Sequence, residues 1–184
     1  LILDVPLNFR DPFKVPIKNK RNYLIESFKI AIDLAKNKKI KGFINCPINK
    51  LETFGNKTIG ITEFLAKKEK ILGKEAMLIY NKKLAVSPIT THIQVRKISR
   101  VLNKKLIIKK LVTIDKFYKK IFNVKPNIGL LGLNPHNYEL RNKSEEKKII
   151  IPALKKLKKL GIKVSGPLSG DTAFTNFKKK KFNI

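Results

Sequence analysis

The stretch that decides the fold reads NIGLLGLNPHNYE and runs from Asn127 to Glu139. Its apolar residues are spaced by two glycines and stop at Asn134-Pro135, a pattern typical of a buried strand that ends in a turn. His136 follows at once. Loops at the carboxyl ends of strands are where open α/β sheets build their ligand crevices. We therefore expect an α/β protein with a site at this strand end.

The second of the two histidines, His92, has a similar setting, after the apolar segment 84–89 and the polar pair Thr90-Thr91. Two imidazoles at strand ends suggest one site, where they serve as metal ligands or as a general acid and base. Taken singly, each is more easily explained as a hydrogen-bonded structural residue, and their shared setting makes the two explanations equal. A catalytic metal normally has three protein ligands, so the third would be Asp171 or a residue beyond 184.

The length of 184 residues suits one full core, or one and a half lobes of a larger α/β protein. The chain begins with Leu1 instead of Met, and its last residues, KKKKFNI, lead into the start of an apolar strand. We therefore expect a piece that lacks both ends. The single cysteine, Cys46, excludes an internal disulfide framework and fits a reducing compartment. Without a signal peptide or a spanning apolar run, the expected location is the cytoplasm, with no membrane partner.

The formal net charge of +29 raises the question of a nucleic-acid partner. The lysines are spread through every predicted helix, and the run at 155–159 lies on a helix whose other face carries leucines. The aromatic residues are mostly placed as core residues and do not alternate with basic ones, as a nucleic-acid surface would require. We favour solvated helix faces over a polyanion site.

The periodicity of apolar residues predicts an ordered series of elements. Helices are expected over residues 24–38, 61–72, 95–102, 107–121 and 144–161, and strands over residues 43–46, 76–80, 84–88, 128–133 and 162–165. Residues 1–20 are expected to form a loop or an edge segment, and Pro152 to kink the last helix or open its second part. This alternation predicts a mainly parallel, doubly wound sheet with the 76–88 pair as an antiparallel edge.

Polar residues gather near several predicted strand ends. Asn49 and Lys50 follow the first strand, and Asp171 lies in the glycine-rich loop after the last. Lys50 is suited to hold a phosphate or carboxylate, although a simple exposed lysine is equally consistent with its position. Thr62 is a candidate N-cap of the second helix, whose free amides would favour an anion. No G-x-G-x-x-G motif occurs, so a dinucleotide would have to bind in a non-standard way.

Six ordered segments resemble motifs of the 4-hydroxythreonine-4-phosphate dehydrogenase family of vitamin B6 biosynthesis. They are INCPINK (44–50), the turn with Thr62-Glu63, TTH (90–92), GLNPH (132–136), Glu145-Glu146 with residues 151–153, and GPLSGDTAF (166–174). The resemblance covers almost the whole chain apart from its N-terminal stretch. It implies a fold like that of isocitrate and isopropylmalate dehydrogenases, with residues 1–184 as an incomplete part of a two-lobed enzyme whose lobe boundary the sequence leaves open.

The resemblance also implies a site and its ligands. The family is homodimeric, with the active site at the subunit interface, and uses NAD or NADP with one divalent metal, here zinc, magnesium, manganese or cobalt. Three histidines hold that metal, of which two correspond to His92 and His136, while the third would follow Ile184. Lys50 and Asp171 are the implied catalytic residues, and Asn49 and Thr62 the implied substrate-binding residues. Residues 1–184 alone would then be inactive.

The implied reaction is the metal-dependent oxidation and decarboxylation of 4-phosphohydroxy-L-threonine to 3-amino-2-oxopropyl phosphate. The sequence departs from the family's G-H-T-E motif, because Ile61 stands where the family has a histidine. Gln94 replaces a proline, and residues 137–141 lack the family's glycines. Two alternatives therefore stay open: a dehydrogenase of a four-carbon sugar-acid phosphate such as threonate or erythronate 4-phosphate, and a non-catalytic basic binding protein on the same scaffold.

Overall fold

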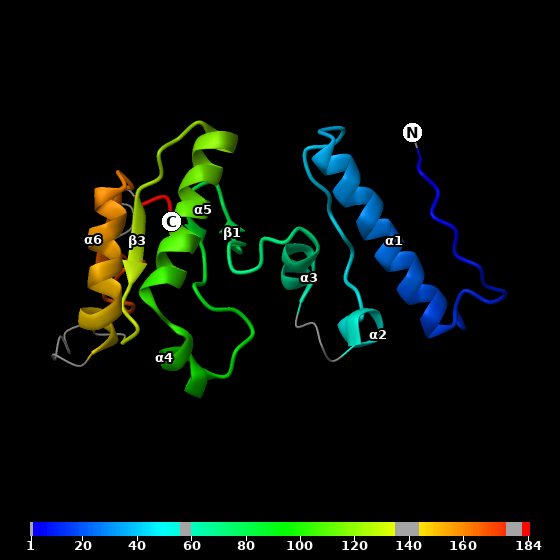
Figure 1. The fold of residues 1–184 in the computed structure, drawn as a ribbon, viewed down its shortest axis with the longest axis horizontal. Helices are drawn as coiled ribbons and strands as arrows, with labels where there is room; N and C mark the ends of the chain where they lie inside the picture. Colours follow the sequence, from blue (N-terminus) through cyan, green and yellow to red (C-terminus); the bar gives the residue numbers. More distant parts are fainter. Residues whose placement is uncertain (1, 56–59, 135–143, 176–181) are drawn as a thin grey trace. The chain divides into compact units, whose positions relative to one another are not determined.

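The computed structural model describes residues 2–55, 60–134, 144–175 and 182–184 (Figure 1). The chain divides into two compact units, Leu1–Phe64 and Leu65–Ile184. The first unit contains helices α1 (Ile17–Lys36) and α2 (Lys50–Phe54) and the start of α3 (Ile61–Lys68). In the described part of the chain, no helix is both long and apolar enough to span a membrane.

A cluster of phenylalanine rings forms the core of the first unit. Phe28 is the buried residue of α1, and its ring centroid lies 6.1 Å from that of Phe43, 6.4 Å from Phe54 and 5.7 Å from Phe64. Helix α1 begins directly after Pro16, so the prediction of a loop over residues 1–20 is wrong for its last residues. Proline's fixed φ suits a helix start, and the polar residues that follow it hid the helical periodicity.

The predicted strand over residues 43–46 is also wrong. Among its residues only Phe43 turns inward, whereas Ile44 is 102% exposed and Cys46 is exposed. A strand needs a neighbour to satisfy its backbone groups, and the described residues of the first unit provide none. Of residues 43–46, only Phe43 therefore contributes to the core, and the segment forms no strand.

The second unit combines helices with short strands. Its elements are β1 (Ile79–Tyr80), β2 (Ala85–Val86), the 3₁₀ turn η2 (Val95–Lys97), α4 (Ile98–Val101), α5 (Lys104–Phe122), β3 (Ile128–Leu131), the π-helical turn η3 (Glu146–Ile150), α6 (Ile151–Lys159) and β4 (Val164–Leu168). β1 and β2 pair antiparallel, and β3 and β4 pair parallel, as predicted. Pro152 lies in the first turn of α6, which confirms that it opens the second part of this helical segment.

The last residues of the chain connect the two strand pairs. The amide of Ala85 donates to the carbonyl of Asn183 (2.9 Å), and the amide of Gly129 donates to the carbonyl of Ile184 (2.7 Å). β2, residues 182–184, β3 and β4 thus form one hydrogen-bonded row. The row confirms the α/β class, and the larger doubly wound sheet stays a prediction.

Parallel pairing brings the carboxyl ends of β3 and β4 to the same level. Leu131 and Leu168, the last residues of the two strands, are register partners, and the amide of Gly132 donates to the carbonyl of Leu168 (2.9 Å). Only glycine fits at position 166, because its φ is +136° and a Cβ there would lie 2.3 Å from the carbonyl oxygen of Leu130. The two loops that follow these strands therefore start side by side.

Helices α5 and α6 pack against each other, and Figure 1 shows α6 alongside β3. Their inward faces carry Ile107, Leu111 and Leu157, each at most 2% exposed. Asn103 caps the start of α5 by accepting the Leu106 amide (2.9 Å), and Asn123 ends it in the left-handed conformation. The expected helix over residues 107–121 is confirmed, with a slightly earlier start.

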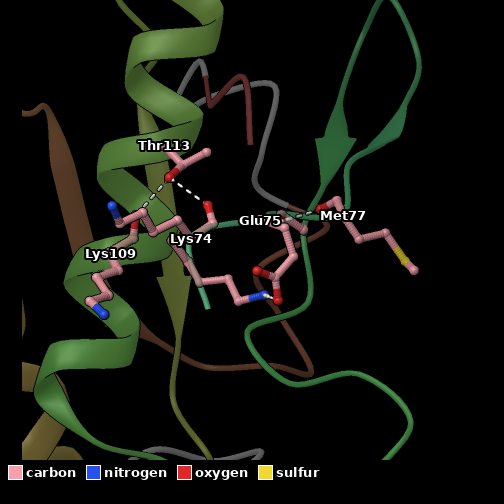
Figure 2. Close-up of polar contacts among 7 residues, drawn as sticks. Lys74, Glu75, Met77, Lys109 and Thr113 are labelled. Carbon is pink, nitrogen blue, oxygen red and sulfur yellow. Dashed lines mark hydrogen bonds and ion pairs between the residues drawn. The ribbon is translucent and has the colours of Figure 1, made fainter. Parts of the chain in front are cut away.

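The lead-in to β1 is fixed to α5 by polar contacts, which Figure 2 shows. The Thr113 hydroxyl lies 2.8 Å from the carbonyl oxygen of Lys74 and 3.0 Å from that of Lys109. Next to it, the Lys110 ammonium lies 3.9 Å from a carboxylate oxygen of Glu75, with side chains only 7% and 17% exposed. These contacts hold the segment that leads through β1 and β2 toward Thr90.

Replacing Leu157 by alanine tests the shared core of α5, α6 and β4. The side chain is fully buried, so Leu157→Ala should lower the free energy of unfolding by about 2–5 kcal/mol. Leu160→Ala, on the same helical segment but 52% exposed, should change it by about 0.5 kcal/mol or less. Urea unfolding followed by circular dichroism measures both, and equal losses would contradict this core.

Substitutions at Glu75 test the buried ion pair. Glu75→Gln removes the charge that compensates the Lys110 ammonium, and should cost about 2 kcal/mol of unfolding free energy. The double variant Glu75→Gln/Lys110→Met should recover most of that loss, because no buried charge is left. Urea unfolding of the three proteins decides: a single variant as stable as the wild type would show that the pair does not anchor this segment.

Candidate functional site

An apolar pocket of about 330 Å³ lies in the second unit. Thr90, Leu133 and Phe174 line it, together with side chains of α5 such as Ile107 and Leu111. Thr90 belongs to the segment TTH, Leu133 to GLNPH and Phe174 to GPLSGDTAF. Three of the strand-end loops singled out in the sequence therefore meet at one pocket, whose size is typical of small-molecule sites.

His92 lies at the end of one of these loops, two residues after Thr90. It is exposed and has φ of +54°, a conformation that few non-glycine residues adopt. The described residues contain three other such cases, each just after a helix: Lys38, Lys70 and Asn123. His92 has no helix end to explain its conformation, and strained residues of this kind concentrate at functional sites.

The chemistry of His92 suits a metal ligand. No hydrogen bond or ion pair engages its imidazole within the described part of the chain, so a ring nitrogen is available for a cation. The described residues contain no group of three His, Cys, Asp or Glu side chains placed to hold a metal. His136, the second predicted ligand, lies outside the described residues, so its role stays a prediction.

Asp171 lies in the turn that follows β4 and is exposed. The Ser169 hydroxyl donates to its Oδ1 (2.5 Å), and the amide of Ala173 donates to the carbonyl of Ser169 (2.9 Å). Ala173 and Phe174 line the pocket. The turn thus holds the Asp171 carboxylate close in sequence to the pocket wall, and its role in the site stays a prediction.

Asn49, Lys50 and Thr62 belong to the first unit, and the prediction that they join the same site stays open. Asn49 is the N-cap of α2, where its side-chain oxygen accepts the Glu52 amide (3.2 Å), and Lys50 begins that helix with an exposed side chain. This cap uses the side-chain oxygen of Asn49 and not its NH₂ group.

Thr62 is not an N-cap, contrary to the prediction. It is the second residue of α3, and the Phe64 amide donates to the carbonyl of Gly60 (3.0 Å). The carbonyl that accepts the first helical hydrogen bond marks the cap position, so Gly60 occupies it. The Thr62 side chain is half-buried in the first turn of α3.

Glu146 is a residue whose place the sequence did not reveal. It is 1% exposed, and its Oε1 accepts the amides of Leu133 (2.8 Å) and Asn134 (3.0 Å), just beyond β3. The sequence shows it as one of two adjacent glutamates in a family motif, without indicating what its side chain contacts. Its partners are backbone amides in another segment, and side-chain patterns carry no information about such contacts.

Known proteins resemble this chain over nearly its full length. Residues 2–184 match the family model described as pyridoxal phosphate biosynthetic protein PdxA. A 4-hydroxythreonine-4-phosphate dehydrogenase of Sulfurihydrogenibium sp. is 37% identical over 182 residues, 96% of this chain and 55% of the relative. A protein of Oceanobacillus iheyensis, named provisionally as D-threonate 4-phosphate dehydrogenase, is 32% identical over 89% of this chain and 50% of its own length.

A solved structure gives the same result for the fold. The 4-hydroxythreonine-4-phosphate dehydrogenase of Klebsiella pneumoniae superposes with a TM-score of 0.86 at 28% identity, over 98% of this chain and 57% of that protein. The chain thus spans about half the length of the relatives that it matches. With its ordered motifs, its parallel strand pair and a match over residues 2–184, the chain belongs to the PdxA family.

Proposed function

We propose that the protein, in its natural length, oxidises and decarboxylates 4-phosphohydroxy-L-threonine with NAD or NADP, giving 3-amino-2-oxopropyl phosphate for pyridoxal phosphate synthesis. The observation that carries the proposal is the meeting of three family motifs at one apolar pocket in the second unit. Apolar walls exclude water and strengthen electrostatic interactions with a charged substrate.

In this proposal His92 and His136 are two ligands of a divalent cation: zinc, magnesium, manganese or cobalt. When bound, the cation lowers the pKa of the substrate hydroxyl, while NAD or NADP takes up the hydride. The exposed imidazole of His92, which has no partner among the described residues, fits the ligand role. A third ligand, expected beyond residue 184, would complete the site at the interface of a cytoplasmic homodimer.

The other predicted residues act on the substrate. Asp171, positioned by the Ser169 hydroxyl, orients the substrate or a metal ligand from the turn after β4. Lys50 supplies a positive charge to the phosphate or carboxylate group. Asn49 contributes the NH₂ group that its cap leaves unused, and Thr62 its hydroxyl.

A sugar-acid phosphate is the second candidate substrate. Ile61 opens α3, next to Thr62, and offers no hydrogen bond where the family has a histidine. Loss of one donor favours a substrate that places a different group at this position. Threonate or erythronate 4-phosphate is therefore the alternative, in keeping with the provisional name of the Oceanobacillus iheyensis relative.

Reduction of NAD(P) in the presence of 4-phosphohydroxy-L-threonine tests the proposal. We expect activity that a chelator abolishes and that added divalent metal restores. His92→Ala should lower kcat/KM at least about 100-fold, because an imidazole ligand is lost. Gln94→Ala, at an exposed neighbouring position outside the proposed machinery, should leave the activity unchanged.

Other outcomes have distinct meanings. Turnover of threonate or erythronate 4-phosphate with no turnover of the amino-acid substrate would assign the second candidate. Activity that survives both the chelator and His92→Ala would overturn the metal site. No turnover and no metal binding would leave a basic binding protein, for which salt-sensitive association with nucleic acid is the expected property.

A further inference from the structure

The carboxylate of Glu146 joins the end of β3 to the start of the α6 segment. The hydrogen bonds between β3 and β4 end with the amide of Gly132, and the next two amides, of Leu133 and Asn134, both donate to Glu146 Oε1. The Glu146 side chain therefore accepts the backbone hydrogen bonds that follow directly after the last one between β3 and β4. It fixes the direction in which the chain leaves β3.

Glu146 buries a carboxylate, and only one of its two oxygens has a hydrogen-bond partner among the described residues. It is 1% exposed, and its second oxygen, Oε2, is buried without a hydrogen-bond partner among the described residues. No ion pair to Glu146 is found in the described part of the chain either. Burying a carboxylate costs free energy unless hydrogen bonds compensate it, and at Oε1 the two amides just beyond β3 supply that compensation.

The position of the two amides suggests what the glutamate does. Leu133 lines the pocket, and Asn134 is the last described residue before His136, two positions further along the chain. A carboxylate that holds two successive amides restricts the backbone at both residues. The same restriction sets the starting point of the segment that carries the proposed ligand.

We propose that Glu146 is a positioning residue, which holds the Leu133-Asn134 backbone so that His136 is delivered to the metal site. This inference rests on the proposed function, because it requires His136 to bind a metal. Glu146 itself touches neither metal nor substrate. It acts through the two backbone amides, as residues behind a metal ligand commonly do through hydrogen bonds.

Cobalt binding and hydrogen exchange test this role together, in the protein of natural length. Glu146→Ala should weaken Co²⁺ binding about 10–100-fold, seen in the visible absorption of the bound ion, and remove exchange protection at the amides of Leu133 and Asn134. Glu146→Gln, which keeps an acceptor oxygen, should retain most of both. Glu145→Gln, the matched change at the preceding glutamate, should alter neither.

The results separate this inference from the proposed function. If the wild-type protein binds no Co²⁺, the proposed metal site itself fails. If the wild type binds and Glu146→Ala binds equally well, only the positioning role is overturned. The positioning role is also overturned if amide exchange at Leu133 and Asn134 is the same in Glu146→Ala as in the wild type. It is likewise overturned if Glu146→Gln binds Co²⁺ as weakly as Glu146→Ala. Protection along α5 and α6 reports whether each variant is folded.

Discussion

The parallel pairing of β3 with β4 is the interaction on which the second unit depends. The two strands end on register partners, Leu131 and Leu168, so the loops that follow leave the sheet at one level. Gly166 permits this close approach, since any side chain there would collide with the carbonyl of Leu130. The pocket walls at Leu133 and Phe174 follow from this geometry. A site that needs groups from several segments can form here because the strands are parallel.

Other contacts in the second unit support the carboxyl ends of β3 and β4, and they differ in the free energy that their burial costs. The packing of α5 and α6 is ordinary burial of apolar side chains such as Ile107 and Leu157. The Lys110–Glu75 pair and the Glu146 carboxylate are more expensive, since each removes charge from water. The Lys110–Glu75 pair anchors the lead-in to β1, and Glu146 the exit of β3, so the costly groups occur where loops toward the pocket need support. His92, with its left-handed backbone, adds local strain on the same unit.

The sequence predicted the parts of the fold that depend on local periodicity. Helix α5 and strands β3 and β4 were recognisable because their buried residues recur at helical or strand spacing. The start of α1 was missed because polar residues follow Pro16, and residues 43–46 were assigned to a strand because a short apolar run says nothing about a partner. For the site, three of the loops that the motifs singled out line one pocket, while the roles of His92 and Asp171 stay predictions. The contact of Glu146 with two backbone amides could not be predicted from the sequence, because it depends on how the chain folds between residues 134 and 146 and not on a side-chain pattern.

Whether the strand-end loops of the second unit build a metal site can be seen by anomalous diffraction from crystals of the natural-length protein grown with zinc. We expect one zinc ion at the mouth of the apolar pocket, about 2.1 Å from a ring nitrogen of His92. His136 should supply a second ligand at a similar distance. Zinc bound elsewhere, or an empty pocket mouth with His92 turned away from it, would show that these loops do not form a metal site.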